Sequence, residues 1–408
     1  MTNALPTRIA TVYVMFEEYD FLEQQIAALN AQDFRDFTFV CVSGHQSDEA
    51  RIRATLAKAA LPTRLLKRTS DNGPAGGFYD GEAWCLAEGF DVVVHIERDC
   101  FPTGPDLMRR LAEAIARAPV AVPVCMPDGI PMGWRFCAVR AEVLRAVGLS
   151  YRHLYFLTED VYFYRNVTRR HRPEILTDVS VYHAPIIAKH TFTDKYLVAF
   201  PYLWARNHML FPITLIKTHR SLRDVLNFLG YFVSVVIYGV HLAIRGKRRS
   251  AGHIARGVWD GLWFREDRLA KDRIEQTDPD YNVREVPSFD ADLVLDKSRF
   301  DIGPGAVLSA IFGVRRRVLL RRTSQLVLLA CLFVADTLVI TDGARYWILK
   351  EHPREGVAAL ALFYVTLVVS TLLAVPALAF GLAASLRSHA TSVPTVPPLT
   401  GAAATPGR

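Results

Sequence analysis

Short strand-like and helix-like segments alternate along this chain up to about Pro185, and long apolar segments follow after Leu222. The strand-like segments are rich in β-branched and apolar residues, whereas the helix-like segments repeat apolar residues at helical spacing. This alternation predicts an α/β domain with a largely parallel sheet. The expected strands cover residues 9–16, 37–42, 64–67 and 91–96, and the expected helices cover 21–30, 51–60 and 83–88.

Three apolar segments in the second half approach the length of a membrane-spanning helix, about 20 residues. Residues 326–340 and 357–386 predict a transmembrane helical hairpin whose turn covers 342–355. Basic clusters flank the earlier segment, 225–244, on both sides. A single crossing there would oppose the positive-inside rule. A re-entrant or interfacial helix and a true span both remain open for that segment.

Apolar residues between Ile254 and Trp263 recur at helical spacing. This pattern fits either a helix on the membrane surface or a helix packed in a core. The whole pattern divides the chain into five expected parts. They are an α/β domain at 1–210, membrane-interfacial or re-entrant helices at 211–265, a linker and basic segment at 266–322, a transmembrane helical hairpin at 323–387 and a disordered tail at 388–408.

Composition and charge narrow the expected partners. The chain is 51% hydrophobic with a net charge of +7, and its basic runs lie beside apolar segments. This arrangement favours membrane lipid at the cytoplasmic surface over nucleic acid, for which there is no recognisable binding motif. The six cysteines lack zinc-site spacing, so we expect free thiols in a reducing compartment. No signal-peptide pattern is evident, so we expect the α/β domain to face the cytoplasm.

Four short motifs follow one another in the first half, at 71–78, 97–99, 158–160 and 182–185. The first is rich in small residues and predicts a turn that backbone or ligand can approach closely. The second places two acids after a buried strand, where ligands of open α/β sheets bind and where Mg²⁺ or Mn²⁺ finds oxygen ligands. A solvated turn in which Arg98 neutralises both acids is the alternative.

The third motif places Glu159 and Asp160 at the start of a helical segment. Such carboxylates either cap the helix or act as a general base toward a hydroxyl. His183 ends a β-like stretch and is either structural or a metal ligand. Together the four motifs supply what is needed to hold a metal–diphosphate and to deprotonate a hydroxyl.

These motifs and their order resemble the inverting glycosyltransferases of family 2, which have a GT-A fold; the resemblance covers residues 8–210. In that family a turn of the type N-x-G-x-A-G-G precedes a strand that ends in D-x-D. Next in the family pattern comes an acid pair with an arginine five residues further on, and after it a histidine. The matching residues here are Asn72–Gly77, Glu97-Arg98-Asp99, Glu159-Asp160 with Arg165, and His183.

The resemblance implies a Rossmann-like nucleotide-sugar domain with Asp160 as the base and Glu159 beside it. It implies that Mn²⁺ or Mg²⁺ is held by Glu97, Asp99 and His183. The acceptor side would include Trp134, Glu159 and Arg165, although Trp134 could equally be a core residue. The donor side would include Asn72, Gly73, Ala75, Gly76, Gly77, Glu97, Arg98 and Asp99.

The chain is most similar to the rhamnosyltransferase and galactofuranosyltransferase branch. This implies a donor such as UDP-galactofuranose or dTDP-rhamnose and a polyprenyl-diphosphate-linked glycan acceptor, used for cell-wall polysaccharide at the bacterial inner membrane. Three departures matter: Glu97 replaces an aspartate, Ser43-Gly44-His45 replaces the usual nucleoside motif, and Phe16-Glu17-Glu18 replaces the usual turn after the first strand. They keep a second reading open, a non-catalytic GT-A scaffold that binds lipid-linked glycan or a partner glycosyltransferase.

Overall fold

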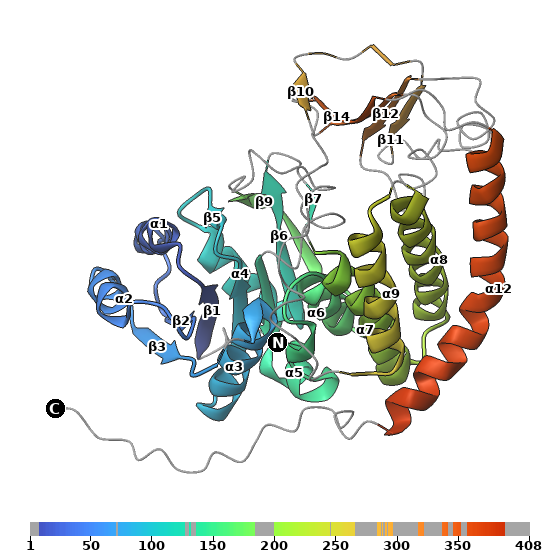
Figure 1. Ribbon diagram of the computed structural model, residues 1–408. Coiled ribbons are helices and arrows are strands. Elements are labelled where there is room, and N and C mark those ends of the chain that lie inside the picture. Colours follow the sequence, from blue (N-terminus) through green and yellow to red (C-terminus); the bar gives the residue numbers. More distant parts are fainter. Residues whose placement is uncertain are drawn as a thin grey trace. The chain divides into compact units, whose positions relative to one another are not determined.

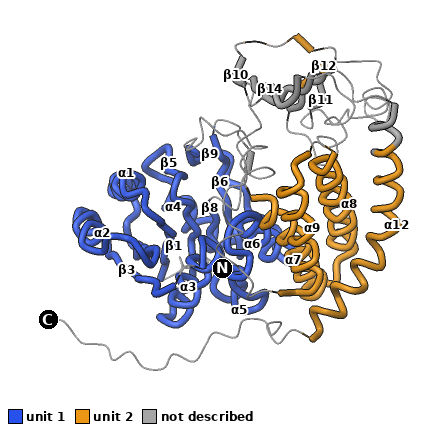
Figure 2. Tube along the Cα trace, viewed as in Figure 1, with its two compact units in different colours: residues 1–186, 389–408 blue, residues 187–388 orange. Residues whose placement is uncertain are grey.

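The structure is a computed structural model (Figure 1). It describes residues 8–70, 72–126, 130–131, 136–183, 200–244, 246–265, 284–286, 288, 290–291, 293–296, 317–321, 337–341, 346–351 and 357–387. The chain forms two compact units, one from Met1–Ile186 with His389–Arg408 and one from Ile187–Ser388 (Figure 2).

The first unit is built on a nine-stranded sheet. Its strands are β1 (Ile9–Met15), β2 (Thr38–Ser43), β3 (Thr63–Lys67), β4 (Val92–Ile96), β5 (Cys100–Pro102), β6 (Val120–Met126), β7 (Ile130–Pro131), β8 (Phe136–Arg140) and β9 (Glu174–His183). Their order is β3-β2-β1-β4-β8-β6-β9-β5, and β7 pairs with β6. The strands β3, β2, β1 and β4 are parallel, whereas β8 runs antiparallel to β4 and β6. The sheet is therefore mixed rather than largely parallel.

Helices cover both faces of this sheet. Successive residues of each strand point to opposite faces, so that a strand of consecutive apolar residues supplies a hydrophobic core on each side. On β1, Tyr13 and Met15 join one hydrophobic core, and Val12 and Val14 join the other. The first core packs against α1 (Tyr19–Asn30), α2 (Glu49–Leu56) and α4 (Leu107–Arg117). The second packs against α3 (Gly73–Ala87), α5 (Ala141–Val147) and α6 (Glu159–Thr168), and a short 3-10 turn, η1, covers Arg152–Leu154.

The expected strands and helices of the first 100 residues are confirmed, apart from the beginning of α3 and the end of α2, which stops at Leu56 instead of residue 60. The small residues at 72–77 do not form a turn, because the helix already starts at Gly73. A Cβ on Gly77 would lie 2.5 Å from Val14 Cγ1, and one on Gly81 would lie 2.4 Å from Val12 Cγ1. Because these glycines lack side chains, α3 can pack closely on β1. This packing is the physical reason why residues 73–77 form a helix instead of the expected turn.

The second unit combines long helices with a small sheet. The helices are α7 (Pro201–His219), α8 (Leu222–Ile244), α9 (Arg248–Leu262) and α12 (Val357–Arg387), and each packs against the other three. The sheet has the order β10-β14-β13-β12-β11, made of β10 (Arg284–Val286), β11 (Leu293–Asp296), β12 (Arg317–Arg321), β13 (Thr337–Thr341) and β14 (Tyr346–Glu351).

Helix α9 packs on α7 through small residues. A Cβ on Gly257 would lie 2.4 Å from the Tyr202 carbonyl oxygen, and the buried Asp260 accepts a hydrogen bond of 2.9 Å from Tyr202 Oη. Trp259 and Trp263 lie on the exposed side. The expected apolar stripe is therefore divided: glycines and Asp260 face the core, and the two tryptophans do not.

The expected transmembrane hairpin is not confirmed. Residues 337–340, the end of its first segment, lie in β13, which pairs with β12 and β14; residues 326–336 lie outside the described part of the chain. A short apolar run with β-branched residues fits a buried strand as well as a helix, so its pattern was ambiguous. Strands β10, β11 and β12 likewise lie in the expected linker, and the expected tail at 388–408 is outside the described residues.

Two helices have the length and hydropathy of membrane spans, Leu222–Ile244 and Tyr364–Arg387. About 50% of the apolar window in the first is buried inside the structure, against 22% in the second. Core helices of soluble proteins pass the same test, so these helices give weak support for membrane association.

The close contact between α3 and β1 predicts a cost for any side chain at Gly81. We expect Gly81→Ala to lower the free energy of unfolding by about 1–3 kcal/mol, because overpacking outweighs the better helix propensity of alanine. Thermal unfolding followed by circular dichroism measures this. Gly252→Ala in α9 is the control, because nothing lies within 4 Å of its added Cβ. An unfolding temperature unchanged by Gly81→Ala would contradict the packing argument.

Candidate functional site

The candidate site lies where the connections of the sheet reverse direction. From β1 the chain moves to β2 on one side, and it later returns to β4 on the other side of β1. Ligands of open α/β sheets bind at the carboxyl ends of strands at such a switch point. Glu18 follows β1 and Glu97-Arg98-Asp99 follows β4. Arg98 Nη1 lies 2.8 Å from Glu18 Oε1, so the charge of Arg98 is matched across the switch point.

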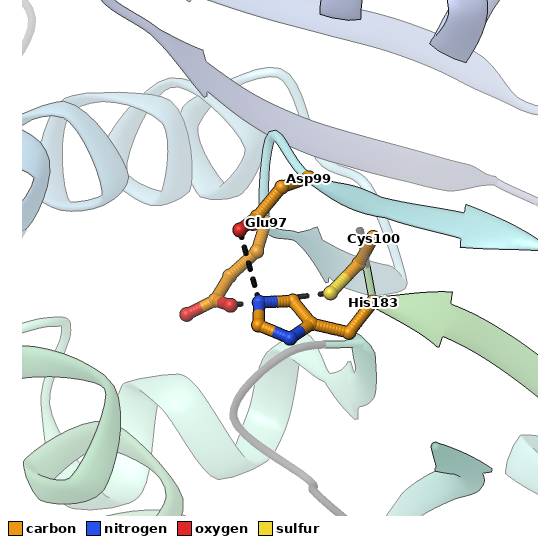
Figure 3. A group of neighbouring side chains, drawn as sticks. All are labelled: Glu97, Asp99, Cys100 and His183. Atoms are coloured by element: carbon orange, nitrogen blue, oxygen red, sulfur yellow. Dashed lines mark hydrogen bonds and ion pairs between the residues drawn. The ribbon is translucent and has the colours of Figure 1, made fainter. Parts of the chain in front are cut away.

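Four side chains converge beside this point: Glu97, Asp99, Cys100 and His183 (Figure 3). One potential ligand atom from each lies within 4.8 Å of the others. His183 Nε2 is 2.9 Å from Asp99 Oδ2, and the Cys100 thiol lies 3.9 Å from Glu97 Oε2. The structure thus brings together Glu97, Asp99 and His183, as expected, and adds Cys100, which the sequence analysis missed.

The antiparallel pairing of β5 with β9 creates this cluster. Cys100 and His183 are direct cross-strand partners, and Asp99 precedes β5. The side chains of Asp99 and His183 are 14% and 29% exposed, so the cluster is reachable from solvent. Carboxylate oxygens, an imidazole nitrogen and a thiol at these separations fit a single divalent metal ion.

The second acid pair, Glu159 and Asp160, occupies the first turn of α6. Asp160 Oδ1 accepts a 2.7 Å hydrogen bond from the Val161 amide. The residues just before the helix have positive φ: 62° at Tyr155, 69° at Leu157 and 69° at Thr158. This conformation is a true outlier for a β-branched residue such as Thr158 and costs about 1–3 kcal/mol per residue.

The strained segment packs on the start of α3. The Tyr155 carbonyl accepts a 3.1 Å hydrogen bond from the Ala75 amide, and a Cβ on Gly73 (φ +63°) would lie 2.2 Å from the same oxygen. The glycine motif is therefore packed against protein on this side, which is why the interpretation as an open turn is wrong. Of the predicted donor residues there, Gly73, Ala75, Gly76 and Gly77 are buried and Asn72 is half-buried.

Of the remaining predicted residues, the structure describes Arg165 but neither Trp134 nor Asp71. Arg165 is half-buried in the middle of α6, on the same helix as the acid pair. Trp134, expected on the acceptor side, lies outside the described residues, as does Asp71.

Arg68 is a buried residue at this edge that the sequence analysis missed. It directly follows β3, and its guanidinium donates to the Gly73 carbonyl at 2.6 Å and to the Ser43 carbonyl at 3.4 Å. It therefore fixes the start of α3 against the end of β2. The sequence signal that could have identified Arg68 is its position directly after a parallel strand.

A second missed group is the fully buried carboxylate of Glu82 on α3. It accepts hydrogen bonds of 2.6 Å from both the amide and the hydroxyl of Ser150, and it lies 2.5 Å from His95 Nε2. The His95 ring stacks between Phe78 and Phe163, with centroid separations of 4.6 and 3.9 Å. These contacts connect four segments: α3, β4, α6 and the segment before η1.

Two buried tyrosines lie close to acidic residues of the site: Tyr13 near Glu18 and Asp99, and Tyr162 near Glu82. Burial raises the pKa of Tyr13 well above its usual range, and the charges of Glu18 and Asp99 add to the effect while Arg98 opposes it. Burial also raises the pKa of Tyr162, with a smaller contribution from Glu82. Both phenols therefore stay protonated at neutral pH.

The chain matches no protein-family model. No curated protein matches it either. Among solved structures it is similar to S. aureus TarS, with 12% identity and a TM-score of 0.42 over 55% of this chain and 43% of that chain. The chain therefore spans less than half of that structure.

Two further structures cover 64% of this chain. S. aureus TarS 1–349 in complex with UDP-GlcNAc has 12% identity and a TM-score of 0.45, over 84% of its own length. The mannosyltransferase PcManGT from Pyrobaculum calidifontis in complex with GDP-Man and Mn²⁺ has 13% identity and a TM-score of 0.43, over 88% of its length.

The Glu82 contacts predict a large loss of stability when this carboxylate is removed. We expect Glu82→Ala to cost about 3–5 kcal/mol, because it leaves buried polar partners uncompensated. Urea unfolding measures the loss. Glu142→Ala, whose parent side chain is 68% exposed, is the control and should be nearly neutral. A loss for Glu82→Ala as small as the control's would show that the buried carboxylate does not hold these segments.

Proposed function

We propose that this chain is a metal-dependent, inverting glycosyltransferase that uses a nucleotide-sugar donor. The observation that carries the proposal is the cluster of Glu97, Asp99 and His183 at the switch point of an α/β sheet. A second acid pair lies on α6, which contacts β4 through the stacking of Phe163 on His95. Metal ligands and a separate carboxylate base are the two parts that such a transfer needs.

In this proposal Glu97, Asp99 and His183 hold Mn²⁺ or Mg²⁺. When bound, the ion supplies positive charge that stabilises the departing nucleoside diphosphate. The motif at Glu97-Arg98-Asp99 and the half-buried Asn72, just before α3, provide the donor side.

Asp160 acts as the general base. It takes the proton of the acceptor hydroxyl while that oxygen forms a bond to the anomeric carbon and the bond from this carbon to the diphosphate breaks. Attack from the face opposite the leaving group inverts the sugar configuration. Glu159 positions the acceptor or the base, and Arg165 and Trp134 complete the acceptor side.

For the acceptor we propose a polyprenyl-diphosphate-linked glycan, and for the donor UDP-galactofuranose, dTDP-rhamnose or a related sugar. Exposed apolar side chains along α12 support a membrane setting: Val365, Val368, Leu372 and Val375 are 57–71% exposed. We place the protein at the bacterial inner membrane, with the first unit facing the cytoplasm and acting in cell-wall polysaccharide synthesis.

Donor binding and transfer test the proposed reaction. Calorimetry with a nucleotide-sugar panel should show binding that requires Mn²⁺, and transfer to a lipid-linked acceptor should follow. We expect Asp160→Asn to lower the transfer rate by about 10²–10⁴-fold, with donor affinity nearly unchanged, because only the base is lost.

Glu142→Gln, at an exposed position, is the control and should leave both measurements unchanged. Transfer retained by Asp160→Asn would remove Asp160 as the base. Failure of the folded protein to bind any donor would favour the scaffold that binds lipid-linked glycan or a partner enzyme.

The exposed face of α12 predicts lipid contact. We expect the double change Val368→Arg and Leu372→Arg to reduce flotation of the chain with liposomes, because each arginine costs about 2.5–3.5 kcal/mol near the bilayer centre. Glu142→Arg changes the net charge by the same amount at an exposed position of the first unit and should float normally. Unchanged flotation of the double variant would place the membrane contact elsewhere.

A further inference from the structure

We infer that the Cys100 thiolate is a direct ligand of the divalent metal and makes this site prefer Zn²⁺ or Co²⁺ to Mg²⁺ and Mn²⁺. The inference deepens the proposed function and rests on it for the metal site. It assigns a specificity-determining role to a residue that follows the acidic motif directly in the sequence.

The sheet fixes the position of this thiol. Cys100 begins β5 and pairs directly with His183 of β9, and directly opposed residues of an antiparallel pair project to the same face. The Cys100 amide also donates a 3.0 Å hydrogen bond to the Glu97 carbonyl, which closes the turn between the acids and β5. Backbone contacts on both sides therefore hold Sγ beside the imidazole and the carboxylates (Figure 3).

The separations suit one ion. Two ligands bound at about 2.0–2.3 Å lie at most about 4.6 Å apart, when the ion is between them. The four ligand atoms here lie within 4.8 Å of one another, so small rotamer adjustments suffice. On coordination the thiol proton leaves to solvent, and the sulfur replaces its contact with Glu97 by a bond to the metal.

The donor types decide the preferred metal. Mg²⁺ and Mn²⁺ favour oxygen ligands, whereas thiolate and imidazole favour Zn²⁺ and Co²⁺ among the common divalent ions. A site with one sulfur, one nitrogen and two carboxylates therefore differs in selectivity from one built of carboxylates and histidine only.

A buried cysteine can also be a small apolar core residue. The chain offers a matched comparison, because Cys41 on β2 is equally buried and belongs to the same hydrophobic core as Cys100. Within the part of the chain that the structure describes, Cys41 belongs to no group of metal-ligating side chains. Packing roles affect both residues alike, whereas a ligand role affects Cys100 only.

Co²⁺ titration of the purified full chain, followed by absorption spectroscopy, tests the inference. Co²⁺ bound to a thiolate gives a near-ultraviolet charge-transfer band in addition to its visible d–d bands. We expect the wild type to show both. Cys100→Ser should keep the d–d bands and lose the charge-transfer band, and Cys41→Ala should keep both.

Competition between Zn²⁺ and Mn²⁺ provides the second measurement. We expect the preference for Zn²⁺ to fall at least tenfold in Cys100→Ser and to stay unchanged in Cys41→Ala. Binding of Co²⁺ without a charge-transfer band, or a band that persists in Cys100→Ser, would overturn the inference. Absence of Co²⁺ binding by the folded wild type would overturn it as well.

Donor binding separates this inference from the proposed function. If Mn²⁺-dependent binding of a nucleotide sugar is observed without thiolate ligation, the glycosyltransferase proposal stands and the role of Cys100 falls. If neither Co²⁺ nor Mn²⁺ binds and no donor binds, both proposals fail.

Discussion

The carboxylate of Glu82 is completely buried on α3, and the segments that carry the candidate site bond or stack around it. Removing a carboxylate from water costs several kcal/mol, a cost that only well-placed partners offset. Ser150 supplies two donors, His95 Nε2 lies 2.5 Å from the same carboxylate, and the His95 ring in turn stacks on Phe163 of α6. Neither α3, β4 nor α6 can therefore shift alone, which keeps the acids after β4 and those on α6 in a constant relation.

Local side-chain patterns were sufficient to predict β1 to β4 and most of the helices between them. The apolar runs of β1, β2 and β4 reflect their burial directly. Local patterns failed where tertiary packing decides between local preferences. The glycines and proline at 72–77 favour a turn on their own, and only close packing on Val12 and Val14 selects a helix. The run at 337–341 could pair as a strand or continue as a helix, and its partners, β12 and β14, decide.

The candidate site shows the same division. Glu97, Asp99 and His183 could be predicted, since each ends or follows a strand and has a side chain suited to a metal. Cys100 could not, because its contact with His183 depends on the pairing of β5 with β9, and nothing in its local sequence reports that pairing. Glu82 also looked like an ordinary helix residue, since its partners Ser150 and His95 lie on other elements.

The segment before α6 explains why α3 begins with glycine. Tyr155, Leu157 and Thr158 hold left-handed backbone conformations that no isolated chain would favour. Contacts with the start of α3 offset that cost, and they require position 73 to lack a side chain, since a Cβ there would collide with the Tyr155 carbonyl. The glycine motif and the acid pair are thus two halves of one packing arrangement. Strain offset in this way fixes the start of α6, which the proposed role of Asp160 as a base requires, since a small displacement of a catalytic group slows a reaction.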